Sequence, residues 1–217
     1  MEAAQERCPE LEPRTAARSQ LYLLLRLAFA FPDAEFFDAV RDGDFAVRLA
    51  ELCAHLPYDV MAKATLGLGS PGSDYAGFEA EYIRLFDVGA AGPPCPLYGG
   101  VYIGDRMKVM EDATRFYNFF YLRLSPQVRE LPDHITTELE FMHYLTYREA
   151  EVRMQGADPT SLLRAERDFL ARHLCRWLPR LQERLASKEA IPFFPALVDF
   201  TLAFLRADHD HAATLAA

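Results

Sequence analysis

The clearest hydrophobic pattern in the chain lies within residues 130–151. Its apolar positions recur at spacings of four and three, the periodicity of one helix face, and they are Ile135, Leu139, Met142 and Leu145. Pro132 favours a helix start through its fixed backbone angle, and Asp133 offers a side-chain acceptor to the N–H groups of a first turn. Gly156 is a typical stop signal. The pattern predicts a buried helix that Asp133 caps.

Helical spacing of apolar residues recurs along most of the chain, and no segment shows the sustained alternation of a β-sheet. The other predicted helices cover residues 15–30, 34–41, 44–56, 74–86, 105–124, 160–186 and 192–206. Pro179 is expected to kink or split the helix that contains it. The predicted fold class is all-α, a single bundle-like domain of roughly eight helices over residues 14–208. Residues 1–13 are expected to be a flexible N-terminus, and residues 209–217 a polar C-terminal tail.

The longest irregular segment covers residues 88–104, VGAAGPPCPLYGGVYIG. Its prolines and glycines preclude a regular helix, and long structured loops in compact domains often carry function. Tyr98 lies in this loop rather than on a helical stripe. Tyrosine combines a broad apolar face with a polar tip, which suits peptide binding. The alternative is core packing, which explains most of the 16 Phe and 10 Tyr residues.

His134 stands beside Asp133 in the expected first turn of the helix. One interpretation makes the two side chains a binding element at an exposed helix end. The alternative is that Asp133 is only a cap and His134 a surface residue, because caps of this kind are common.

Composition and charge narrow the classes of partner. The chain has 217 residues, 51% of them hydrophobic, so it can bury a sizeable core. The net charge is -9 without a basic stripe, which argues against nucleic acid as a partner. Four widely spaced cysteines without a CxxC motif are typical of reduced thiols in a cytoplasmic protein. The first apolar run, residues 21–31, is shorter than the ~20 residues that span a bilayer, so no stable membrane insertion is expected.

Candidate metal and catalytic motifs are sparse. A di-iron bundle needs Glu-x-x-His on each of two helices, and only Glu140 and His143 have that spacing. Residues 208–211, DHDH, could hold a metal weakly, but a frayed polar terminus explains them as well. No dinucleotide or phosphate-loop fingerprint is present. From the sequence, we expect a protein that has no catalytic activity and binds neither a metal nor a cofactor. A metal-dependent all-α enzyme and a general helical adaptor remain as alternatives.

Three segments have an order and spacing that match a known pattern. Residues 81–86, EYIRLF, resemble an aromatic-x-x-Leu-Phe motif. Residues 94–102, PCPLYGGVY, are similar to a proline-rich loop that ends in an aromatic residue, a small pair and often Val-Tyr. Residues 130–134, ELPDH, are followed by ELEFM at 138–142. Together, over about residues 15–208, these segments resemble the TorD/DmsD/NarJ family of redox-enzyme maturation chaperones.

The resemblance implies a cytoplasmic all-α protein without catalytic activity. Members of the family bind the N-terminal leader, often a twin-arginine signal peptide, of the catalytic subunit of a molybdenum enzyme. They hold it until its pterin cofactor is inserted and then release it for assembly or export. The implied partner is the molybdopterin-containing catalytic subunit of a DMSO-reductase-family oxidoreductase, with its leader. Carried over onto this sequence, the peptide-binding surface comprises Tyr82, Leu85, Phe86, Pro96, Leu97, Tyr98, Tyr102, Glu130, Pro132, Asp133 and His134.

A leader of this kind has a basic end and an apolar middle. An aromatic groove can bury the apolar part, as in helix-in-groove recognition. Asp133 and Glu130 are expected to meet the arginines.

Some positions depart from the family pattern. Many members have Trp where Tyr82 and Tyr98 stand, and Pro where Leu97 stands. Leu-Pro-Asp resembles the NarJ branch, whereas His134 resembles the DmsD branch. This mixture is similar to chaperones of type II enzymes of the DMSO-reductase family, which act on substrates such as ethylbenzene, dimethyl sulfide, selenate or chlorate.

Overall fold

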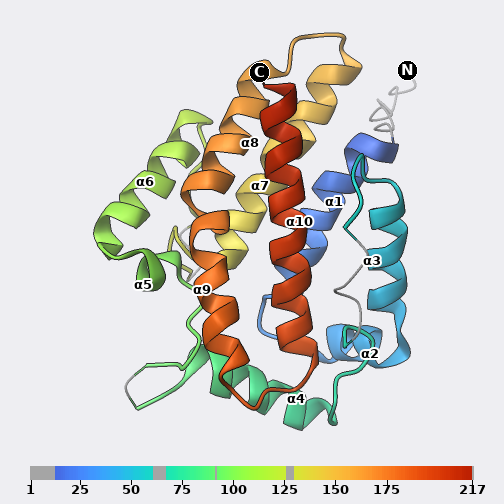
Figure 1. The fold of residues 1–217 in the computed structure, drawn as a ribbon, viewed down its shortest axis with the longest axis vertical. Helices are drawn as coiled ribbons and strands as arrows, with labels where there is room; N and C mark the ends of the chain where they lie inside the picture. Colours follow the sequence, from blue (N-terminus) through green and yellow to red (C-terminus); the bar gives the residue numbers. More distant parts are fainter. Residues whose placement is uncertain (1–12, 61–66, 91, 126–129, 217) are drawn as a thin grey trace, which may run out of the picture.

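The computed structural model describes residues 13–60, 67–90, 92–125 and 130–216. Every regular element in these ranges is helical, so the predicted all-α class is confirmed (Figure 1). The elements are α1 (Pro13–Ala28), α2 (Ala34–Asp42), α3 (Asp44–Ala54), α4 (Tyr75–Tyr82), the π-helical turn η1 (Ile83–Asp87), α5 (Gly99–Ile103), α6 (Arg106–Phe119), α7 (Ile135–Met154), α8 (Thr160–Arg172), α9 (Leu174–Ala186) and α10 (Phe193–Leu215). The expected flexible N-terminus lies almost entirely outside the described residues.

The long helices form a bundle around one core. Helix α1 packs along α7, and α10 packs against both α8 and α9. In Figure 1, α10 runs beside α8 and α9 through most of the height of the molecule, and α4 lies at the end opposite the C-terminus. The predicted apolar stripe of α7 is confirmed, because its four members are fully buried: Ile135, Leu139, Met142 and Leu145. The periodicity therefore identified the core face of α7 correctly.

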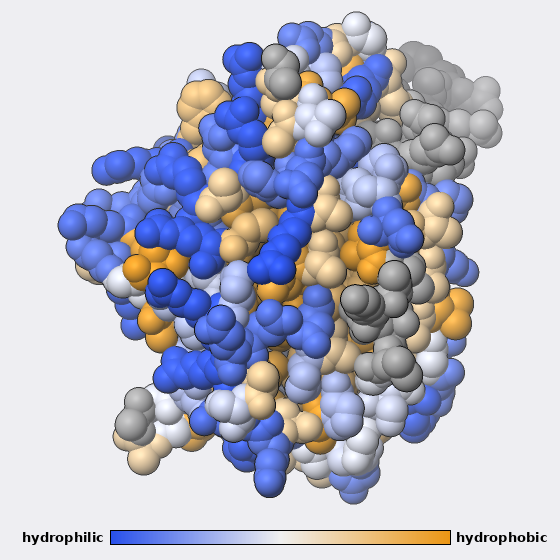
Figure 2. Space-filling view, in the orientation of Figure 1, coloured by the Kyte–Doolittle hydropathy of each residue, from blue (hydrophilic) through white to orange (hydrophobic). Residues whose placement is uncertain are grey.

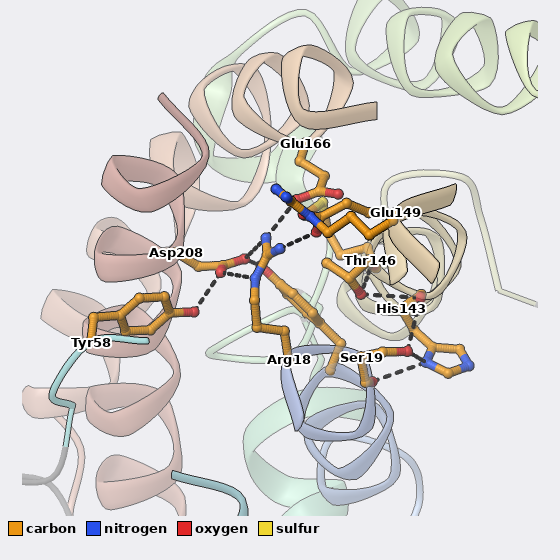
Figure 3. Close-up of polar contacts among 11 residues, drawn as sticks. Arg18, Ser19, Tyr58, His143, Thr146, Glu149, Glu166 and Asp208 are labelled. Atoms are coloured by element: carbon orange, nitrogen blue, oxygen red, sulfur yellow. Dashed lines mark hydrogen bonds and ion pairs between the residues drawn. The ribbon is translucent and has the colours of Figure 1, made fainter. Parts of the chain in front are cut away.

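A buried ionic cluster joins four of these helices. The guanidinium of Arg18 in α1 lies between carboxylates from three other helices, Glu149 of α7, Glu166 of α8 and Asp208 of α10 (Figure 3). These side chains are at most 3% exposed. Arg153 also pairs with Glu149, so two guanidinium groups face three carboxylates. Burial raises the pKa of Glu166 to about 8, although the charge of Arg18 acts in the opposite direction.

The start of α7 differs from the expected one. His134, not Asp133, is the N-cap, because its Nδ1 accepts the N–H of Thr136 at 3.3 Å. Asp133 is fully buried, and its Oδ2 accepts the N–H of Gly100 at 2.9 Å. The prediction that Asp133 caps the helix was wrong, because its carboxylate instead accepts the N–H of Gly100 in the first turn of α5.

Two further boundaries differ from the sequence pattern. The helix expected over residues 160–186 breaks at His173, whose backbone angles of -117° and -101° are not helical, whereas Pro179 lies inside α9. The expected polar tail from residue 209 is instead the continuation of α10 to Leu215, and Ala212 is fully buried there. Packing against the bundle stabilises both arrangements in a way that local residue preferences do not encode.

The surface in the orientation of Figure 1 is mainly hydrophilic, with apolar residues in separate patches (Figure 2). No helix in the described ranges is long and apolar enough to cross a membrane.

Candidate functional site

A hollow of about 600 Å³ lies where the proline-rich loop meets the start of α7 and the end of α1. We call it the aromatic hollow. Its lining residues are Ala30, Phe31, Tyr82, Phe86, Asp87, Gly92, Pro93, Pro96, Leu97, Tyr98, Val101, Arg106, Glu130, His134, Thr136 and Arg184. Most of these are apolar or aromatic, with a few charged groups among them, which is the usual composition of a ligand or peptide site.

Backbone hydrogen bonds hold the proline-rich loop against the start of α7. The N–H of Ile135 donates to the carbonyl of Leu97 at 2.9 Å, and the N–H of Gly99 donates to the carbonyl of Asp133 at 2.8 Å. Tyr98 and His134 form an isolated antiparallel bridge between these bonds. Their rings meet edge to face with centroids 4.8 Å apart. These contacts place Tyr98 beside the start of α7.

The polar groups around Tyr98 form a small network. Its hydroxyl donates to Oε2 of Glu130 at 2.8 Å, and the guanidinium of Arg106 lies 5.4 Å from its ring centroid. Burial raises the pKa of Tyr98 well above its usual range, and the hydrogen bond to Glu130 adds to this effect. Nε2 of His134 lies 3.6 Å from the same Glu130 oxygen. Burial lowers the pKa of His134 despite that carboxylate, and so favours the uncharged imidazole.

The opposite wall of the hollow is aromatic. Phe31, in the segment between α1 and α2, is 52% exposed, and its ring packs edge to face on Tyr82 with centroids 5.6 Å apart. Tyr82 contacts Phe86 at 5.2 Å and donates its hydroxyl to the carbonyl of Phe29 at 2.9 Å. The π-helical turn η1 contains Phe86, and such turns are frequent at functional sites. An exposed phenyl ring on a fixed aromatic base gives this wall an apolar surface open to a partner.

Seven of the eleven predicted site residues line the aromatic hollow. They are Tyr82, Phe86, Pro96, Leu97, Tyr98, Glu130 and His134. The other four do not line it. Leu85 and Asp133 are fully buried, Tyr102 is 7% exposed with its hydroxyl bound to the carbonyl of Pro96, and Pro132 lies outside the lining. Asp133 in particular is turned toward Gly100, so the expectation that it meets arginines of a leader does not fit its position.

Several residues of the hollow carried no signal in the sequence. Phe31 lies at the end of an apolar run, a position that also suits a core residue. Arg106 and Arg184 come from α6 and α9, and only the packing of those helices brings them to the hollow. Val101, by contrast, belongs to the recognised loop motif but was not assigned to the binding surface, and it is 43% exposed.

The two residues of the candidate metal motif, Glu140 and His143, bind different partners. Glu140 accepts from Arg26 at 3.1 Å, while Nδ1 of His143 lies 2.8 Å from the hydroxyl of Ser19. Within the described ranges, no group of three or more His, Cys, Asp or Glu residues is arranged to hold a metal ion.

Comparison with known proteins identifies the family. The sequence profile of the family described as nitrate reductase delta subunit matches residues 44–183. A perchlorate reductase assembly chaperone protein from Dechloromonas aromatica (strain RCB) is 33% identical over 199 residues, which cover 89% of this chain and 89% of that protein. The chain belongs to the NarJ/TorD family of assembly chaperones. The resemblance inferred from the three sequence segments is thereby confirmed.

Other members of the NarJ/TorD family are also similar to this chain. A chlorate reductase assembly chaperone protein from Ideonella dechloratans is 35% identical over 170 residues, covering 77% of this chain and 76% of that protein. A crystal structure described as that of a redox enzyme maturation protein from Archaeoglobus fulgidus covers 89% of this chain and 92% of its own, with a TM-score of 0.51 and 19% identity, and it supports the fold alone. The named relatives are assembly proteins rather than catalysts, and this family member is accordingly not an enzyme.

Proposed function

We propose that this protein is a cytoplasmic chaperone that binds the N-terminal leader of a molybdoenzyme catalytic subunit in the aromatic hollow. The observation that carries the proposal is the pairing of Tyr98 with His134 inside a hollow open to a partner. The names of the relatives, which include chaperones for perchlorate and chlorate reductases, support a molybdopterin-containing subunit of the DMSO-reductase family as the client.

Binding in the hollow would be driven mainly by removal of apolar surface from water. The exposed ring of Phe31 and the exposed side chain of Val101 provide apolar surface that a bound peptide would remove from water. Burial favours the uncharged form of His134, and an apolar segment can cover that form without the large desolvation penalty of an imidazolium. The leader is held while the cofactor is inserted and is then released for assembly or export, so the interaction is reversible and needs no catalytic group.

A pull-down from the native host tests the proposal. The tagged protein, its Tyr98→Ala variant and its Tyr121→Ala variant are compared by mass spectrometry of the captured proteins. Tyr121 is a suitable control because it is 95% exposed and does not line the hollow. The expected result is capture of a molybdoenzyme catalytic subunit by the parent and by Tyr121→Ala, with strong loss for Tyr98→Ala. Equal capture by all three proteins would reject the hollow as the binding site, and capture of unrelated proteins alone would favour a general adaptor.

A further inference from the structure

The aromatic hollow does not end at Phe31. A second hollow of about 490 Å³ begins on the other side of this residue, and Ala30 and Phe31 line both. The second hollow lies between the end of α1 and helices α2 and α3, and its other lining residues are Leu24, Leu27, Asp33, Glu35, Phe36, Ala39, Asp44, Phe45 and Arg48. Leu27 is 48% exposed there. The apolar surface therefore continues from one hollow into the next across Phe31.

Negative charge predominates around the second hollow. The exposed side chains of Asp33, Glu35 and Asp44 face it with a single basic residue, Arg48. The guanidinium of Arg48 already donates to Glu51 at 3.2 Å and to Gln20 at 2.6 Å. Three carboxylates against one paired guanidinium leave an excess of negative charge at this position.

The aromatic hollow has no such excess. Its two carboxylates, Asp87 and Glu130, are matched by Arg106 and Arg184. Glu130 also accepts the hydroxyl proton of Tyr98 and lies beside His134. An incoming arginine would meet two guanidinium groups in this hollow, whereas an apolar segment would meet mainly rings.

We propose that a bound leader lies across both hollows, with its apolar middle in the aromatic hollow and its basic end against the carboxylates of the second hollow. This inference rests on the proposed function. Leaders that target proteins for export have a positively charged end followed by roughly 7 to 15 apolar residues. The acidic second hollow and the aromatic hollow, which meet at Phe31, follow the same order. A second copy of this chain is a poorer occupant, because each copy has a net charge of -9.

The test uses two synthetic peptides that differ only in charge. One carries two adjacent arginines followed by about 12 apolar residues, and the other has glutamines in place of the arginines. Binding of each to the full-length protein is measured by fluorescence anisotropy at low ionic strength. We expect the parent to bind the arginine peptide about fivefold more tightly than the glutamine peptide, as two exposed ion pairs would give.

The variant that tests the second hollow is Glu35→Gln with Asp44→Asn. Asp33 is left unchanged because its carboxylate accepts the N–H of Phe36 at 2.8 Å and caps α2. The matched control is Glu111→Gln with Asp210→Asn, which makes the same change in charge at exposed positions that line neither hollow. The test variant should lose the preference for arginine, and the control should keep it.

The outcomes separate the inference from the proposed function. An unchanged preference in the Glu35 and Asp44 variant, or an equal loss in the control, would overturn the inference while leaving leader binding intact. Failure of both peptides to bind the parent would overturn both proposals. A photo-crosslinker beside the arginines gives a readout on the unmodified parent: labelling within residues 33–48 supports the orientation, and labelling within residues 92–106 contradicts it.

Discussion

The indole Nε1 of Trp177 donates a hydrogen bond to Oε2 of Glu138 at 2.9 Å, with both side chains fully buried. The ring of Trp177 also stacks on Tyr102 with centroids 5.5 Å apart and an interplanar angle of 15°. The hydroxyl of Tyr102 in turn donates to the carbonyl of Pro96 at 2.9 Å. Trp177, which does not line the aromatic hollow, therefore packs against the proline-rich loop and stabilises it.

This support predicts that Gly99→Ala destabilises the fold. A Cβ at Gly99 would lie 3.0 Å from Cδ1 and Nε1 of Trp177, whose hydrogen bond and stacking prevent an easy shift. We expect a loss of about 1–3 kcal/mol in the free energy of unfolding, measured by urea denaturation. Gly69→Ala is the control, because nothing lies within 4 Å of its Cβ. Equal stability of the two variants would show that the indole is free to move.

Asp133→Ala should weaken folding rather than act mainly on a partner. The change removes the acceptor of the Gly100 N–H in a fully buried position, and an orphaned donor costs about 1–3 kcal/mol. Asp133→Asn keeps an oxygen acceptor and should recover most of the loss in urea denaturation. If Asp133→Ala unfolds like the parent but fails to bind a leader peptide, the original expectation of a contact with the leader is restored.

His134→Asn should affect leader binding more than stability. Asparagine is among the best N-cap residues, so the cap of α7 is retained. The ring that contacts Tyr98 and lines the hollow is lost. We expect a loss of about 1–2 kcal/mol in leader affinity by calorimetry, as for a central interface residue, with a smaller change in the free energy of unfolding. Loss of affinity strictly in proportion to loss of stability would contradict this role.

Glu166 gives the stability of the protein a specific dependence on pH. Its pKa is raised to about 8 in the fold from 4.5, so the folded state keeps a proton that the unfolded state loses. Stability from this group therefore declines as the pH rises from about 4.5 through 8. Glu166→Gln should remove that decline and gain about 1–2 kcal/mol relative to the parent between pH 6.5 and 8.

The pH range from 6.5 to 8 largely avoids the titration of Asp208 and His211, whose pKa values are also shifted. Asp208 has a lowered pKa, and its contribution to stability is lost only in acid, below 3.8. Burial lowers the pKa of His211 from 6.5. This shift makes the stability rise with pH, the opposite trend to that of Glu166, and most of the rise lies below the chosen window. Parallel stability curves for the parent and Glu166→Gln above pH 6.5 would show that Glu166 is ionised in the folded state.

The sequence predicted the parts of the molecule that depend on local pattern. The stripe of α7 follows from residue spacing. The segment over residues 88–104 was expected to contain no regular helix, and this was wrong for its end, because Gly99–Ile103 form the short helix α5. The cap of α7 was assigned to the wrong one of two neighbouring residues, because the choice depends on Gly100, 33 positions away. The break at His173 likewise depends on tertiary neighbours, since its imidazole lies between Asp112 and Glu138.

The same distinction applies to the site. Eleven residues within the three recognised segments were assigned to the site from the sequence, and seven of them line the aromatic hollow. Leu85 lies in one of these segments but faces the core, because only some positions of a short helical turn can point outward. Phe31 and Arg184 belong to elements far from those segments, and no local pattern connects them to the loop.

The most direct test of leader binding in the aromatic hollow is calorimetric titration of the captured client's leader, about 30 residues, into the parent and two variants. The variants are Tyr98→Ala and Tyr121→Ala, with thermal melts run alongside. We predict that Tyr98→Ala loses at least about tenfold in affinity, as expected for an aromatic anchor, while Tyr121→Ala binds like the parent. Undiminished binding by a folded Tyr98→Ala variant would contradict the assignment of the hollow as the leader site.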